Sequence, residues 1–116
     1  MKKNINIVIT GVSSGIGKQL VMNFLQHPEC NVIGIARNQN LLDKLKSEAD
    51  SVFSNHKLHL IAADISTEDG IAKIEATITA LFKHVDILIN NAGMLINKPF
   101  SEINFESWRK IGRAHV

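Results

Sequence analysis

Apolar residues occur along this chain in two alternating patterns, short continuous runs and longer segments with helical spacing. The short runs are rich in β-branched residues and cover positions 5–10 (INIVIT), 31–36 (NVIGIA), 58–62 (LHLIA) and 85–90 (VDILIN). Their length and composition predict four strands. Because runs such as VIGIA and ILI contain almost no polar residue, we expect these strands to be buried on both faces.

Three segments between these runs carry apolar residues at helical spacing. The first follows a Gly/Ser turn and ends before His27-Pro28, the second begins near Asn40 as a candidate N-cap, and the third follows Ser66, which with Asp69 resembles a capping box. The expected inward-facing residues are Ile16, Leu20, Val21, Phe24, Leu25, Leu41, Leu42, Leu45, Ala49, Val52, Phe53, Ile71, Ile74, Ile78, Leu81 and Phe82. Strands alternating with helices predict an α/β fold, a parallel sheet covered on both faces.

Composition narrows the class of protein. The chain has 116 residues, suits one small domain, and is 45% hydrophobic and 21% charged, as in ordinary globular proteins. A single cysteine excludes a disulfide framework, and His56 and His59 lack partners for a metal site. The net charge of +2 is spread along the chain, and no apolar stretch is long enough to span a membrane. We therefore expect a soluble, cytoplasmic chain that binds neither nucleic acid nor membrane.

A glycine-rich turn, TGVSSGIG at positions 10–17, links the first strand to the first helix. Its three glycines would permit the tight turn, close approach of backbone to a phosphate, and close packing of helix on strand. The helix N-terminus would offer free N–H groups to an anion, and Ser13 and Ser14 could add hydroxyl donors. The strand–turn–helix context favours a dinucleotide site over an empty turn. A nucleoside-triphosphatase phosphate loop is disfavoured, because five residues separate Gly11 from Gly17 and Gln19 follows Lys18.

In these residues the chain resembles the short-chain dehydrogenase/reductase family. The turn matches the family pattern TGxxxGxG, Asp64-Ile65 matches the acidic position that contacts adenine, and NNAG at 90–93 matches a motif after the fourth strand. The resemblance implies a Rossmann-like, doubly wound α/β/α fold with a nicotinamide dinucleotide at the carboxyl edge of the sheet. The candidate cofactor-binding residues are Gly11, Ser13, Ser14, Gly15, Ile16, Gly17, Arg37, Asp64, Ile65, Asn91, Ala92 and Gly93.

Arg37 bears on which dinucleotide is bound. It lies twenty positions after Gly17, at the end of the second predicted strand. An acidic residue there would bind the ribose 2′-hydroxyl of NAD, whereas an arginine accommodates the 2′-phosphate of NADP. Neither Ala36, Arg37 nor Asn38 is acidic. The sequence therefore predicts NADP, with NAD as the alternative.

The catalytic residues of the family have no counterpart in this sequence. The resemblance implies a Tyr acid/base, a Lys four positions later and a Ser, all beyond the fourth strand, and the chain contains no Tyr. We therefore expect residues 1–110 to be the N-terminal, cofactor-binding part of a Rossmann domain, truncated after the fourth strand and inactive alone. The whole protein would transfer hydride between the cofactor and a small-molecule carbonyl or secondary alcohol, as a homo-oligomer. The alternative is a non-catalytic dinucleotide-binding module.

We expect the last six residues, IGRAHV at 111–116, not to be encoded by the native gene. They are the translation of a widely used sequencing-library adapter, read as ATC GGA AGA GCA CAC GTC. We therefore expect the native gene to continue beyond the codon of Lys110. A natural short tail is the alternative.

Overall fold

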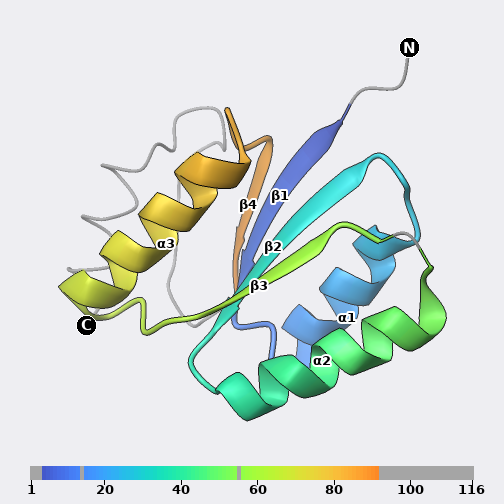
Figure 1. The fold of residues 1–116 in the computed structure, drawn as a ribbon, viewed down its shortest axis with the longest axis horizontal. Coiled ribbons are helices and arrows are strands. Elements are labelled where there is room, and N and C mark those ends of the chain that lie inside the picture. The colour runs from blue at the N-terminus through green and yellow to red at the C-terminus, as the bar shows by residue number, and fades with distance from the viewer. Residues whose placement is uncertain (1–3, 14, 55, 92–116) are drawn as a thin grey trace.

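The fold is described here from a computed structural model for residues 4–13, 15–54 and 56–91 (Figure 1). Strands and helices alternate in the order β1 (Ile5–Thr10), α1 (Gly15–Leu25), β2 (Cys30–Ala36), α2 (Gln39–Val52), β3 (Leu58–Ala62), α3 (Glu68–Leu81) and β4 (Ile87–Asn90). The four strands are parallel and lie in the order β3-β2-β1-β4. Strands β2 and β3 are added on one side of β1, and β4 pairs with its other side. This change of side is the doubly wound arrangement, so the predicted Rossmann-like α/β fold is confirmed.

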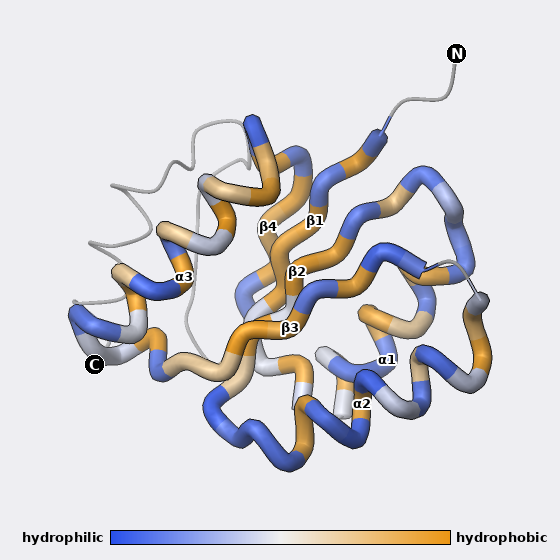
Figure 2. Tube along the Cα trace, viewed as in Figure 1, coloured by the Kyte–Doolittle hydropathy of each residue, from blue (hydrophilic) through white to orange (hydrophobic). Residues whose placement is uncertain are grey.

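Helices cover both faces of the sheet, which explains why the strands lack a polar face. Helices α1 and α2 lie on one face and α3 lies on the other (Figure 1). Successive strand residues therefore enter different cores: Ile7 and Ile9 join the cluster under α1 and α2, whereas Val8 joins the cluster under α3. The middles of the strands are accordingly the most hydrophobic part of the trace (Figure 2).

Two helix starts differ from the sequence prediction. Helix α2 is capped by Asn38 rather than Asn40, because the Asn38 side chain accepts a hydrogen bond from the Leu41 N–H at 3.1 Å. Helix α3 is capped by Thr67 rather than Ser66, because Thr67 Oγ1 accepts from the Gly70 N–H at 2.9 Å. At both helix starts, two candidate capping residues lie within two positions of each other. The sequence pattern does not show which of the two is the N-cap.

Four of the residues expected to face inward are exposed instead. Ile16, Leu41, Val52 and Leu81 retain 71%, 38%, 62% and 48% of their accessible surface, respectively. All four lie in the first or last turns of their helices. Among the described residues, no helix is long and apolar enough to cross a membrane.

Candidate functional site

The carboxyl edge of the sheet brings most of the candidate residues together. Gly11 follows β1, Arg37 follows β2, Asp64 lies two residues after β3, and Asn91 follows β4. The pairing of β1 with both β2 and β4, and of β2 with β3, places these four positions along one edge. Ser14, Ala92 and Gly93 lie outside the described residues.

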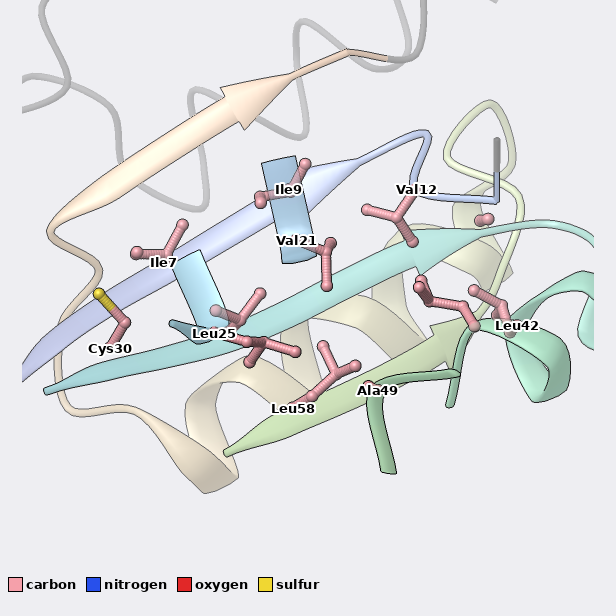
Figure 3. Packing of buried hydrophobic residues seen from close by; sticks show 12 residues of the cluster. Ile7, Ile9, Val12, Val21, Leu25, Cys30, Leu42, Ala49 and Leu58 are labelled. Carbon is pink, nitrogen blue, oxygen red and sulfur yellow. The ribbon is translucent and has the colours of Figure 1, made fainter. Parts of the chain in front are cut away.

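The turn after β1 is fixed to the sheet through its backbone and one apolar side chain. Gly11 has a φ of 71°, and its N–H donates to the Ile35 carbonyl at 2.8 Å. The next residue, Val12, is fully buried and belongs to the core cluster with Leu42 (Figure 3). Because Val12 is anchored in the core, the half-buried Ser13 and the start of α1 are held above the sheet edge.

Gly17 allows α1 to approach the end of β1 more closely than any other residue would. A Cβ atom at this position would overlap the Gly11 carbonyl oxygen and lie 2.7 Å from Asn91 Nδ2. Gly15, which begins α1, has a φ of 60°, and no described residue outside its own helix lies within 4 Å of the position where a Cβ would be. Gly17 therefore permits close packing, while Gly15 leaves backbone open to approach from outside.

A buried threonine, which the sequence analysis did not include among the site residues, connects the turn to β4. Thr10 Oγ1 donates to Asn90 Oδ1 at 2.7 Å and accepts from the Asn91 N–H at 3.0 Å. Asn91 Nδ2 in turn donates to the Gly11 carbonyl at 3.2 Å. The only signal in the sequence was a polar residue at the end of an apolar strand, which needs a partner when buried.

Asp64 is held by Ser66, another residue that the sequence analysis left out of the site. Asp64 Oδ1 accepts from the Ser66 N–H at 2.9 Å and from its hydroxyl at 2.6 Å. These two donors, together with the positive charge of Arg37, lower the pKa of Asp64 below its ordinary value. The carboxylate is therefore ionised at neutral pH and fixed in orientation. Ile65 beside it packs against the α3-side core.

The arrangement fits the phosphates and the adenine half of a dinucleotide. Helix α1 has no acidic residue in its first turn, so its positive end meets no competing carboxylate. Ile16 is exposed beside this end, and Arg37 is exposed and forms no ion pair within the described part of the chain. The open backbone at Gly15 and the free guanidinium suit anionic groups, and the Asp64 carboxylate can accept from an amine. The described residues contain no cluster of His, Cys, Asp or Glu suited to a metal ion.

Comparison with known proteins agrees with this geometry. The model of the short chain dehydrogenase family matches residues 5–114. The chain belongs to the short-chain dehydrogenase/reductase family. The sequence-based resemblance, stated on the glycine turn, Asp64 and the NNAG motif, is thus confirmed at the level of the family.

The chain is similar to known members of the family, but it spans less than half of their length. Serine 3-dehydrogenase of Agrobacterium fabrum is 34% identical over 111 residues, and dehydrogenase/reductase SDR family member 11 of Gallus gallus is 33% identical over 109 residues. These alignments cover 95% and 94% of this chain but only 42% of each relative. L-sorbose reductase of Gluconobacter frateurii, solved with NADPH and L-sorbose, superposes with a TM-score of 0.71 at 25% identity, covering 98% of this chain and 46% of that one.

Proposed function

We propose that this chain binds NADP through the carboxyl edge of its sheet and supplies the cofactor-binding part of a short-chain oxidoreductase. The observation that carries the proposal is the convergence of the Gly11–Gly17 turn, Arg37, Asp64 and Asn91 at that edge. When bound in such a protein, NADP⁺ would accept the hydride and NADPH would donate it. The whole protein would act on a carbonyl or secondary alcohol of a small molecule.

Each group at the edge has a separate role in the proposed binding. The backbone around Gly15, at the positive end of α1, would meet the pyrophosphate, because no described residue outside α1 lies within 4 Å of the position where a Gly15 Cβ would be. Asp64 would accept a hydrogen bond from the adenine amino group through the carboxylate that Ser66 orients. Asn91 has its side-chain N–H committed to the Gly11 carbonyl, so it would hold the turn in place.

Arg37 supports the choice of NADP over NAD. Its side chain is exposed at the end of β2, and its positive charge already acts on Asp64. A planar guanidinium can bind a 2′-phosphate through two parallel hydrogen bonds. The residues on either side of it, Ala36 and Asn38, carry no negative charge that would repel the phosphate.

The test is calorimetric titration of the 116-residue chain with NADP and with NAD. We expect NADP to bind about tenfold more tightly or better, and R37Q to remove this preference without weakening NAD binding, because the charged hydrogen bonds are lost. The matched control is K44Q, which removes one positive charge from the exposed surface of α2. Equal binding of both dinucleotides by the unaltered chain would contradict the NADP assignment, and binding of neither would contradict the cofactor site.

The second candidate function is a non-catalytic dinucleotide-binding module, which would use the same carboxyl edge. Both candidates predict the same titration result. Sequencing the source gene from a fresh amplicon across the Lys110 codon distinguishes them. A continuing frame with a Tyr-x-x-x-Lys segment supports the oxidoreductase, and a native stop codon shortly after it supports the binding module.

A further inference from the structure

The opposite, amino edge of the sheet contains a groove that the proposed cofactor site does not use. It has a volume of about 560 Å³ and lies between the first residues of β1, β2 and β3 and the segment that follows α3. Five basic side chains line it, and no described lining residue is acidic: His56, Lys57, His59, Lys83 and His84. The strands separate this groove from the glycine turn by roughly 20 Å, the length of a six-residue strand.

Three of the five basic side chains are available to a ligand. His56 contacts the Asp50 carboxylate, and His84 Nε2 lies 3.2 Å from Asp86 Oδ1. Lys57, His59 and Lys83 are exposed and form no hydrogen bond or ion pair through their side chains with residues that the structure describes. The ammonium groups of Lys57 and Lys83 therefore have no carboxylate partner among the described residues, and the exposed His59 ring lies beside them.

The floor of the groove is tied together by side-chain amides. Asn31 Nδ2 donates to Asn6 Oδ1 at 2.9 Å, and Asn6 Nδ2 donates to the His84 carbonyl at 3.0 Å. The Asn6 N–H donates to Asp86 Oδ2 at 2.8 Å, and the Asp86 N–H donates to the Asn6 carbonyl at 2.8 Å. These bonds fix the segment that bears Lys83 and His84 against the start of β1.

One wall of the groove is apolar and only partly covered. Leu81, at the end of α3, is 48% exposed, and the following Phe82 is half-buried against the α3-side core. Both residues continue the apolar stripe of α3, yet neither is fully buried. An exposed hydrocarbon surface beside unpaired positive charges suits a ligand that has both an apolar and an anionic part.

We propose that this groove binds a small organic carboxylate with a hydrocarbon chain. Lys57, Lys83 and His59 contact the carboxylate, and the chain lies along Leu81 and Phe82. Inorganic phosphate satisfies the charge alone and leaves the apolar wall in water, so it binds more weakly. Because the groove and the carboxyl edge share no residue, the two sites are tested separately.

The experiment is a titration of the ¹⁵N-labelled chain with octanoate, followed by amide chemical shifts. We expect saturable shifts at Lys57, His59 and Lys83, and smaller shifts with octan-1-ol or inorganic phosphate at the same concentration. Shifts scattered over the sheet, or equal effects of the alcohol and the carboxylate, overturn the proposal. Phosphate binding as tight as that of octanoate also overturns it, because the apolar wall would then contribute nothing.

Variants of exposed residues test the charged side chains and the apolar wall of the groove separately, without changing the buried core. We expect K57Q/K83Q to weaken octanoate binding about five- to tenfold, since exposed charge pairs contribute little individually. We expect L81S to weaken octanoate binding about threefold and to leave phosphate binding unchanged. K44Q, on the outer surface of α2, is the charge-matched control. Unchanged octanoate affinity in K57Q/K83Q contradicts the assignment.

Discussion

The two edges of the same sheet hold their neighbouring segments by different means. At the carboxyl edge, glycine backbone lies against backbone, and the Thr10 and Asn91 side chains turn inward to bind the loops. At the amino edge, Asn6 and Asn31 hold the strand starts together, and charged side chains project from the surface. The carboxyl edge is therefore built from close backbone packing, and the amino edge from side-chain hydrogen bonds near solvent.

This difference determines how much each edge tolerates change. A residue enclosed by backbone cannot accept an added atom unless the chain shifts, whereas a partly exposed amide can be replaced by water. We therefore expect substitutions at the carboxyl edge to lower the free energy of unfolding more than comparable substitutions at the amino edge.

The largest effect is expected from G17A. Because the new Cβ would overlap the Gly11 carbonyl oxygen, α1 must move away from β1, at a cost of about 3 kcal/mol or more in the free energy of unfolding. The same movement should weaken dinucleotide binding. Urea unfolding followed by circular dichroism measures the first effect, and calorimetric titration with NADP measures the second.

Gly15 provides the matched control for this prediction, two residues away on the same helix. A Cβ there would contact none of the described residues outside α1, so G15A should cost only about 1 kcal/mol, from its φ of 60°. A greater loss of stability in G15A than in G17A would show that backbone conformation, rather than close packing, governs this turn.

An intermediate effect is expected from T10V, compared with N6A at the other edge. T10V leaves the half-buried Asn91 N–H and Asn90 carboxamide without the buried hydroxyl they now contact, at a cost of about 1–3 kcal/mol. N6A removes two side-chain hydrogen bonds near solvent, which water can replace, so it should cost about 1 kcal/mol or less.

Urea unfolding of the double variant sharpens this comparison. The two residues lie at opposite ends of β1, so their effects should add within about 0.5 kcal/mol. T10S is the control, because it keeps the hydroxyl and should recover part of the loss. A larger cost for N6A than for T10V would reverse the proposed difference between the edges.

The sequence predicted the strands well and the edges incompletely. Continuous apolar runs located all four strands, because burial on both faces leaves a strong local pattern, and the glycines located the turn. Thr10 and Ser66 were missed as parts of the site. The partners of Thr10 are 80 and 81 residues away along the chain, so no local pattern shows that they meet.

The apolar stripes of the helices also predicted more burial than the fold provides. Ile74 and Ile78 are buried in the middle and later turns of α3, whereas Leu81 at its end is largely exposed. Helical spacing shows which face a residue lies on, but not whether the sheet extends beneath it. The exposed wall of the amino-edge groove was therefore not predictable from periodicity.

The smallest expected effect is on the pKa values of two carboxylates, Asp64 at the carboxyl edge and Asp50 near the amino edge. The pKa of Asp64 is lowered chiefly by the hydroxyl and N–H of Ser66, and less by the charge of Arg37. Asp64 therefore stabilises the fold at neutral pH, and this contribution is lost as the pH falls below about 4. We expect ¹³C NMR titration to show the pKa of Asp64 rising in S66A and rising less in R37Q. A larger rise in R37Q would contradict the ranking.

Salt distinguishes this carboxylate from Asp50, near the amino edge. The pKa of Asp50 is lowered first by its hydrogen bond with His56 and then by the charges of Lys46 and His56, whereas Asp64 depends mainly on neutral donors. At 1 M salt, where the Debye length is about 3 Å, the pKa of Asp50 should rise more than that of Asp64 in the same titration. An equal rise at both sites would contradict this difference between the two carboxylates.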